Sequence, residues 1–130
     1  MIYLDTSALM KLVIRERESM ILREWLTADS QRLKVTSDLG RVEMFRACQR
    51  ADPQCLAIAE QILAEFETIP IAPRVVERAI DVGQPSLRTL DAIHLASAVA
   101  VRGYLSAFVA YDQRLAEAAL AEGLPVVAPG

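Results

Sequence analysis

The chain has 130 residues, of which 53% are hydrophobic and 24% are charged, and its formal net charge at pH 7 is -3. This length suits one compact domain and the composition is too apolar for a disordered tail, so we expect a single globular domain over residues 1–130. The negative net charge excludes attraction of a polyanion such as RNA by the overall field of the protein, so any nucleic-acid binding has to be local.

The location of the protein is predicted from what its sequence lacks. No apolar run approaches the roughly 20 residues of a membrane-spanning helix. The start does not resemble an export signal, because the short apolar stretch of residues 2–4 meets a charge at Asp5. We therefore expect a cytoplasmic protein with no membrane partner. Cys48 and Cys55 have no second pair with which to build a zinc site, and we expect both to be packing residues.

The apolar pattern of the first half alternates between short runs typical of buried strands and longer segments with helical spacing. In chain order, it predicts a strand over 2–4, helices over about 7–14 and 17–27, a strand over 33–36 and a helix ending near residue 50. Thr6 or Ser7 is expected to cap the first helix, and Ser37 or Asp38 the third.

The second half continues the alternation. In chain order, it predicts a helix over 53–66, a strand over 68–72, helices over 73–80 and 87–102, a strand over 107–110, a helix over 112–122 and a strand over 124–127. Pro53 and Pro73 suit the first turn of a helix, and Gly83 suits the position after a helix end. The helix over 87–102 is apolar on nearly every side, which predicts a central buried helix. Strands separated by helices predict an α/β fold with mainly parallel pairing.

Two aspartates follow apolar strands in the same manner. Asp5 comes directly after the first strand, and Asp112 follows the run Phe108 to Tyr111. The carboxyl ends of parallel strands share one edge of a sheet, where loops converge and helix amino termini supply positive dipole ends. We therefore expect these two acids to lie close enough to share a ligand.

Two further acids lie on helices with apolar neighbours. Asp91 belongs to the helix with almost no polar face, and Glu43 shares a stripe with Leu39 and Ala47. An isolated carboxylate in such surroundings is disfavoured unless it becomes neutral, pairs with a cation or binds a metal. An ion pair or a helix cap explains any one of these acids taken alone, and Asp112 occupies an ordinary capping position.

Four such acids from four segments of one small domain favour a metal site over four separate ion pairs. Like charges that gather repel one another unless a divalent cation stands between them. Carboxylate oxygens suit Mg²⁺ or Mn²⁺ rather than zinc. These ions bind phosphate oxygens, activate water and offset the charge of a leaving oxygen, which is the chemistry of phosphodiester hydrolysis.

With these acids aligned, the chain resembles the PIN-domain ribonucleases, and within them the VapC-like toxins of type II toxin-antitoxin systems. The resemblance spans essentially all 130 residues. The segments that carry it are Ile2 to Leu9, Ser37 to Arg46, Leu90 to Ala96, and Phe108 to Leu115. Each segment is a moderate signal, and their order and spacing together make the resemblance strong.

The resemblance implies a three-layer α/β/α fold around a parallel sheet. It also implies a metal pocket built from one acid of each segment, which in this chain are Asp5, Glu43, Asp91 and Asp112. The implied activity is endonucleolytic cleavage of RNA by metal-activated water. Asp5 and Asp91 are assigned to the principal Mg²⁺ or Mn²⁺ ion, Asp112 to the same or a second ion, and Glu43 to holding a metal-bound water. The implied partners are RNA, a cognate antitoxin protein and a second copy of the chain in a homodimer.

The chain departs from the family pattern at Ala110, where many relatives carry a hydroxyl residue two positions before the last acid. Ser7 or Thr6 is a candidate to supply a hydroxyl instead. His94 is the only histidine, and we interpret it as a packed residue bonded to a neighbour rather than as a general base. For Arg46 and Arg88, pairing with the nearby acids is favoured over phosphate contact.

Two other functions remain open from the residues. One is a catalytically weak or inactive PIN-like domain that binds RNA or a partner protein, for which Ala110 is the best support. The other is a phosphatase with a nucleophilic aspartate after the first strand. That chemistry usually requires a second aspartate two positions later, where this chain has Ser7.

Overall fold

The computed structural model describes residues 1–130 and is organised around one sheet of five strands. The strands are β1 (Ile2–Leu4), β2 (Lys34–Ser37), β3 (Glu67–Ile69), β4 (Ala107–Val109) and β5 (Val126–Val127). Their spatial order is β3-β2-β1-β4-β5, and every neighbouring pair is parallel. The predicted parallel sheet is confirmed, and β1 lies at its centre.

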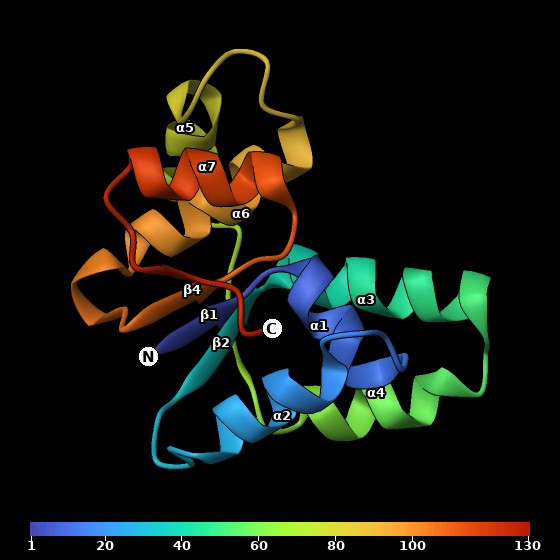
Figure 1. Ribbon diagram of the computed structural model, residues 1–130. Coiled ribbons are helices and arrows are strands. Elements are labelled where there is room, and N and C mark those ends of the chain that lie inside the picture. The colour runs from blue at the N-terminus through green and yellow to red at the C-terminus, as the bar shows by residue number, and fades with distance from the viewer.

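Helices cover both faces of this sheet. They are α1 (Thr6–Val13), α2 (Ser19–Thr27), α3 (Asp38–Ala51), α4 (Cys55–Leu63), α5 (Pro73–Asp81), α6 (Thr89–Ala100) and α7 (Gln113–Ala121), with a short 3₁₀ helix η1 (Arg102–Tyr104). Helices α1 to α4 lie on one side of the strands and α5 to α7 on the other (Figure 1). The fold is therefore the expected three-layer α/β/α arrangement.

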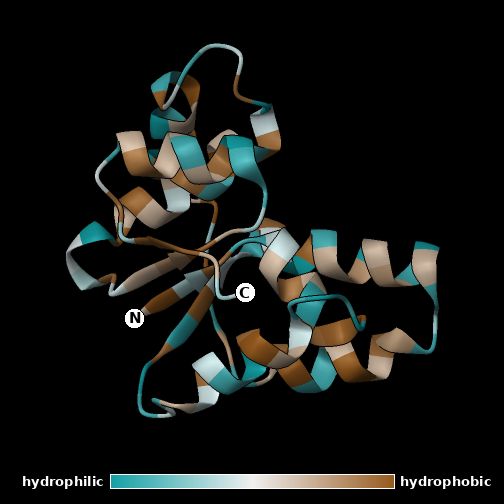
Figure 2. Ribbon diagram, viewed as in Figure 1, coloured by the Kyte–Doolittle hydropathy of each residue, from teal (hydrophilic) through white to brown (hydrophobic).

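Alternation along the strands builds a separate core on each face. Ile2 and Leu4 of β1 pack into the cluster shared with α1 to α4, while Tyr3 points into the opposite cluster with Leu95 of α6 and Phe108 of β4. Successive side chains of a strand point to opposite faces, so a strand covered by helices on both sides is apolar throughout. Figure 2 shows hydrophobic segments in the strands and in α1, α2 and α4.

The helix caps tie three loops to the carboxyl edge of the sheet. Ser37 caps α3 by accepting a hydrogen bond from the Gly40 backbone, as predicted. The first helix is capped by Asp5 instead of Thr6 or Ser7, because the chain turns into the helix directly after β1. Asp112 caps α7 in the same way. Two of the predicted site residues thus also stabilise helix amino termini, as carboxylates do well.

Some predicted boundaries were wrong. Helix α4 begins at Cys55, after a turn that contains Pro53, and ends at Leu63 rather than Phe66. Helix α6 begins at Thr89 rather than residue 87, so Asp91 lies in its first turn. The core of α6 is buried as expected. Gly83 follows α5 with a φ of 71°, a conformation that glycine adopts readily.

Two smaller expectations also have an outcome. Cys48 and Cys55 are both buried and unbonded, so they are packing residues as predicted. No helix has both the length and the apolar character that a membrane crossing requires.

Candidate functional site

The structure brings the four predicted acids to the carboxyl edge of the sheet. Asp5 follows β1, Asp112 follows the neighbouring strand β4, Glu43 lies in α3, and Asp91 lies in the first turn of α6. Burial is the main cause that raises the pKa of Asp5 and of Asp91; the negative charge of Asp112 adds to both shifts, and that of Glu43 adds to the shift of Asp91. The four carboxylates form one electrostatic unit, which we call the acidic cluster.

Asp5 is the most buried member of the acidic cluster, with 3% of its surface exposed. Its Oδ1 accepts hydrogen bonds from the Ser7 hydroxyl at 2.6 Å and from the Ala8 backbone at 2.9 Å. Burial raises the pKa of Asp5 to about 6, although both hydrogen bonds oppose the shift. Ser7 in turn accepts from the Tyr111 backbone at 2.9 Å, which joins α1 to the loop that carries Asp112.

Glu43 is held by side chains from two other elements. Its Oε1 accepts from the Thr6 hydroxyl at 2.6 Å and lies 2.7 Å from Nε2 of His94. Partial burial would raise the pKa of Glu43, but the hydrogen bonds from His94 and Thr6 outweigh burial and hold it below its usual value. Glu43 is therefore kept ionised while its neighbour Asp5 is pushed toward the neutral form.

Asp91 and Asp112 share a single basic neighbour. Arg88 places Nε 3.7 Å from Oδ2 of Asp91 and a terminal nitrogen 3.9 Å from Oδ2 of Asp112. Burial raises the pKa of Asp91, and the charge of Arg88 only opposes that shift. At these distances, and with Arg88 largely exposed, the pairing is weak. The predicted pairing of Arg88 is confirmed, but it does not neutralise the acidic cluster.

The donor chemistry of the acidic cluster fits a hard divalent cation. Hydrogen bonds engage only one oxygen each of Asp5, Glu43 and Asp112; Oδ2 of Asp5 and Oε2 of Glu43 have no partner, and Oδ2 of Asp112 has only the distant Arg88. Mg²⁺ and Mn²⁺ prefer oxygen ligands, and a carboxylate oxygen without a hydrogen-bond partner is available to bind them. As the side chains stand, no three of the acidic, histidine or cysteine groups converge tightly enough to enclose an ion.

The remaining predicted site residues differ in outcome. Both hydroxyl candidates contact the acidic cluster, Thr6 through Glu43 and Ser7 through Asp5. His94 is a packed residue bonded to its neighbours, as expected. Arg46 was predicted to pair with an acid, but it is exposed and forms no ion pair.

The sequence did not single out Tyr3, whose hydroxyl lies 2.7 Å from Nδ1 of His94. The only available signal was a phenol hydroxyl inside an otherwise apolar strand, since a buried tyrosine hydroxyl usually has a hydrogen-bond partner. Its position next to Ile2 and Leu4 suggested packing alone, and the partner comes from a residue 91 positions away.

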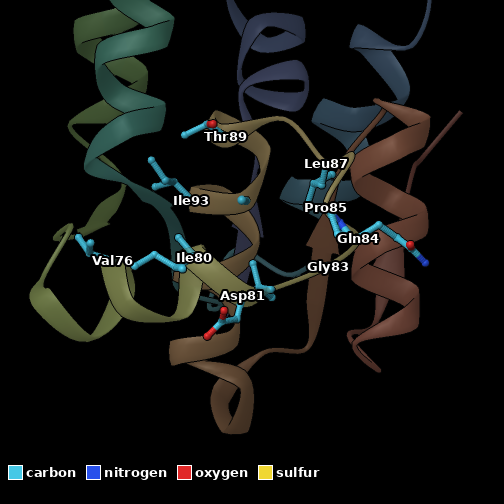
Figure 3. A pocket seen from close by; sticks show the side chains of 12 residues that line it. Val76, Ile80, Asp81, Gly83, Gln84, Pro85, Leu87, Thr89 and Ile93 are labelled. Carbon is cyan, nitrogen blue, oxygen red and sulfur yellow. The ribbon is translucent and has the colours of Figure 1, made fainter.

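A separate concavity of about 520 Å³ lies between α5 and α6 and is mostly apolar. Figure 3 shows Val76 and Ile80 of α5 facing Ile93 of α6, with Pro85 and Leu87 of the connecting loop closing one side. None of the four acids lines it. The chemistry of this protein is therefore to be sought at the acidic cluster.

Comparison with known proteins identifies the family. The family model described as PIN domain matches residues 2–121. Ribonuclease VapC47 of Mycobacterium tuberculosis (strain CDC 1551 / Oshkosh) is 43% identical over 100% of this chain and 98% of its own length. The chain is a VapC-like member of the PIN domain family. Ribonuclease VapC35 of the same strain is likewise 43% identical to this PIN domain, again over 100% of the chain and 98% of the relative.

Solved structures share the fold of this PIN domain at much lower identity. The structure of VapBC2 from Rickettsia felis bound to a DNA fragment from their promoter has a TM-score of 0.78 at 13% identity, covering 98% of each chain. Mycobacterium tuberculosis VapC20, a sarcin-ricin loop cleaving toxin, has a TM-score of 0.75 at 18% identity, covering 99% of this chain and 100% of that one. These likenesses confirm the PIN-type fold.

Proposed function

We propose that this protein is a Mg²⁺- or Mn²⁺-dependent endoribonuclease that acts as the toxin of a toxin-antitoxin pair. The observation that carries the proposal is the acidic cluster, in which four segments of the chain contribute one carboxylate each to the same sheet edge. Membership of the PIN domain family and 43% identity to two proteins called ribonuclease VapC support RNA as the substrate.

We assign each residue of the acidic cluster a separate role toward the cation and the attacking water. Asp5 and Asp91 would hold the principal cation, Asp112 would hold the same or a second ion, and Glu43 would complete the metal pocket by holding a water on the ion. When bound, Mg²⁺ or Mn²⁺ supplies the positive charge that neutralises the phosphate and activates water for in-line attack. Arg88 reaches both Asp91 and Asp112, and its exposed guanidinium is placed to contact a phosphate oxygen of the RNA.

The electrostatics of the acidic cluster support this assignment. Burial is the main cause that raises the pKa of Asp5 and of Asp91, and their hydrogen bonds and basic neighbours do not fully offset it. A bound divalent cation would offset both the burial of these charges and their mutual repulsion, which favours its binding at the acidic cluster.

The decisive experiment removes single charges from the acidic cluster. We expect Asp5→Asn and Asp91→Asn each to keep the fold and to lower Mg²⁺- or Mn²⁺-dependent cleavage of a labelled RNA by at least about 100-fold. Fold is checked by circular dichroism and cleavage by mapping RNA ends. The control is Asp52→Asn, an exposed acid in the turn before α4, which should cut RNA like the wild type. Full activity in either cluster variant would refute the site assignment.

The proposed biological partners are an RNA and an antitoxin protein. The related VapC20 cleaves the sarcin-ricin loop and VapBC2 was solved with promoter DNA, so a structured RNA and a DNA-binding antitoxin are the partners that we propose here. Inducing this chain in a bacterial host with and without its neighbouring small gene tests toxicity, inhibition and substrate together. Unchanged growth and intact RNA would contradict the toxin role.

Cellular location and assembly follow from that role. A toxin that cuts RNA of the translation machinery meets its substrate in the cytoplasm, where we propose that the protein acts. We also propose the homodimer that the family resemblance implies. Light scattering on the purified chain measures its mass directly, and a value near 14.3 kDa at micromolar concentration would reject the dimer.

The alternative function is a PIN-like domain that binds RNA without cutting it. The observation in its favour is that no three candidate ligands converge as the side chains stand. Binding of labelled RNA in the presence of Mn²⁺, with no strand scission by the wild-type protein, would establish this alternative and displace the nuclease.

A further inference from the structure

A buried polar chain leads from the sheet to the acidic cluster. The Tyr3 hydroxyl of β1 lies 2.7 Å from Nδ1 of His94 in α6, and Nε2 of His94 lies 2.7 Å from Oε1 of Glu43 in α3. Tyr3 is fully buried and His94 is 2% exposed. The roles assigned to the four acids do not involve this Tyr3–His94 pair, whose buried polar groups are all hydrogen-bonded and so hold one another in a defined geometry.

The hydrogens of this chain can be assigned from chemistry. A carboxylate only accepts hydrogen bonds, so Nε2 of His94 must carry the hydrogen that it shares with Glu43. When the ring is neutral, Nδ1 is then an acceptor and the Tyr3 hydroxyl donates to it. Thr6 donates its own hydrogen to the same Glu43 oxygen at 2.6 Å. Two donors therefore converge on Oε1, and Oε2 is left free.

The surroundings allow the His94 ring very little movement. The Tyr3 ring stacks on Phe108 with centroids 5.3 Å apart and meets the His94 ring edge-on at 6.0 Å. On the other side, a Cβ placed on Gly40 would stand 3.3 Å from Cε1 of His94 and would collide with the Thr36 hydroxyl. The glycine lets α3 approach α6 closely, and the ring is clamped between two elements.

The same geometry excludes a direct chemical role for His94. Both ring nitrogens are engaged, one with Tyr3 and the other with Glu43 and Thr6, and the ring is shielded from solvent. A general base has to reach the proton that it removes, directly or through one water. His94 acts on the site only through the carboxylate that it touches.

We propose that Tyr3 and His94 are positioning residues that, with Thr6, fix the orientation of Glu43 so that its Oε2 faces the metal and substrate side of the acidic cluster. The inference rests on the proposed function, because it assigns the Glu43 carboxylate a part in that site. A ligand held by a defined outer partner loses fewer degrees of freedom when it binds, and loss of such a partner typically lowers metal affinity or activity about 10- to 100-fold.

The orientation can be tested without metal or substrate. The chain has one histidine, so long-range ¹H–¹⁵N correlation spectra report His94 without assignment ambiguity. In the metal-free wild type, we expect the hydrogen to reside on Nε2. Tyr3→Phe removes the donor to Nδ1 with almost no change of shape, and should replace the single tautomer by a mixture. Unchanged ring spectra in Tyr3→Phe would overturn the inference.

The effect on the site is measured with a pair of amide variants. The glutamine amide of His94→Gln reaches the position of Nε2 and can still donate to Glu43, whereas the asparagine amide of His94→Asn reaches only the position of Nδ1. We expect Mn²⁺ affinity, measured by titration calorimetry without RNA, to fall about 10-fold or more in His94→Asn and to be largely restored in His94→Gln. In RNA cleavage, kcat should fall in His94→Asn and be largely restored in His94→Gln, while KM changes little in both.

A control separates positioning from general loss of stability. Cys48→Ala opens a cavity in α3, the helix of Glu43, without touching the acidic cluster. It should lower the melting temperature and leave Mn²⁺ affinity unchanged. Equal Mn²⁺ affinities for the asparagine, glutamine and wild-type proteins would overturn the inference even if the wild type cuts RNA. A wild type with the expected ring tautomer but no Mn²⁺ binding and no cleavage would instead reject the proposed function.

Discussion

Asp5 has two roles in the fold that oppose each other, because the carboxylate caps a helix and is also a buried charge. Its Oδ1 caps α1, while its charge is buried beside Asp112. The folded-state pKa of Asp5 is raised from 3.8 to about 6, so the folded protein binds a proton that the unfolded chain has released between these pH values. Ionisation of Asp5 therefore destabilises the fold, and this loss develops as the pH rises through the window and is complete above it.

Asp5→Asn should consequently stabilise the metal-free protein. The amide oxygen still accepts from the Ala8 backbone, so the cap remains while the buried charge is gone. We expect the free energy of unfolding to rise by about 1 to 3 kcal/mol at pH 7 and to be nearly unchanged at pH 3.5. Urea denaturation in the presence of EDTA at the two pH values measures it. A destabilised variant at pH 7 would show that Asp5 is well compensated.

At Gly40, the structure predicts that a substitution which usually stabilises a helix will instead lower the free energy of unfolding. Alanine normally stabilises a helix relative to glycine by about 1 kcal/mol. In α3, however, the new Cβ would collide with the Thr36 hydroxyl and crowd His94. We expect Gly40→Ala to lower the free energy of unfolding by about 1 to 3 kcal/mol, as overpacked cores do, in a denaturant titration.

The matched control for Gly40 lies in η1. A Cβ on Gly103 would meet no atom within 4 Å, so Gly103→Ala should be neutral or stabilising by up to about 1 kcal/mol. A neutral Gly40→Ala would mean that α3 can retreat from α6, and the clamp on the His94 ring would lose its support.

At the residue scale, the sequence was informative where a charge lay in apolar surroundings. Asp5, Glu43, Asp91 and Asp112 were found in this way, because an uncompensated carboxylate needs a partner. The partners themselves were harder to predict. Tyr3 and His94 meet across 91 positions of sequence, and the contact depends on the close approach that Gly40 allows. No local pattern encodes it.

At the scale of elements, α3 has a function on each of its faces. Met44 and Cys48 are buried in the core, whereas Glu43 and the exposed Arg46 and Arg50 follow one another along the side of the helix that faces the acidic cluster. Arg46 lies three residues after Glu43, which is about one helical turn. An arginine without an acidic partner, one turn from the site, is well placed to contact a phosphate of RNA bound there.

Arg46→Glu should therefore weaken RNA binding without disturbing the chemistry. We expect KM for RNA to rise about 10-fold, kcat to change little, and the dependence of binding on salt to fall by about one charge. Filter binding and cleavage at several NaCl concentrations measure these quantities. The control is Arg32→Glu, an arginine before β2 and so at the opposite edge of the sheet. Similar defects in both variants would indicate a general electrostatic effect instead of a contact.

The type of each element was predictable, and its boundaries were less so. Hydrophobic period separates strands from helices, and Pro73, Gly83 and Ser37 gave correct termini. The errors arose where turn geometry competes with the apolar pattern. Leu87 is apolar like the helix that follows, but it belongs to a turn closed by its hydrogen bond to Gln84, which delays α6. That delay places Asp91 in the first turn, where the helix dipole favours a carboxylate.

At the scale of the whole molecule, the strand order decides what the four acids can do. The order β3-β2-β1-β4-β5 places the first strand in the centre, so Asp5 lies between the segments that carry Glu43 and Asp112. The sequence predicted parallel strands but contains no local signal for their order, because each pairing joins segments far apart in the chain. The family resemblance implied a parallel sheet and a shared pocket for the four acids, and the strand order itself comes from the structure.

Binding of the ion at the acidic cluster should therefore stabilise the folded state of the whole protein. A ligand that binds only the folded state stabilises it by about 2.7 kcal/mol at 100 times its dissociation constant. For a chain of 130 residues, this corresponds to a rise in melting temperature of roughly 5 to 15 °C. We expect Mn²⁺ to produce such a rise in the wild type, measured by differential scanning calorimetry at pH 7 against NaCl of equal ionic strength.

The variants decide where that stabilisation originates. Asp5→Asn should begin from a higher melting temperature than the wild type, because the buried charge is absent, and should gain less than about 2 °C from Mn²⁺. Asp91→Asn should also lose the gain. Charge removal and ion binding relieve the same repulsion, so the two effects cannot add if the acidic cluster is the metal site. An equal Mn²⁺ gain in the wild type and in Asp5→Asn would place the ion elsewhere on the protein and separate stability from the proposed catalysis.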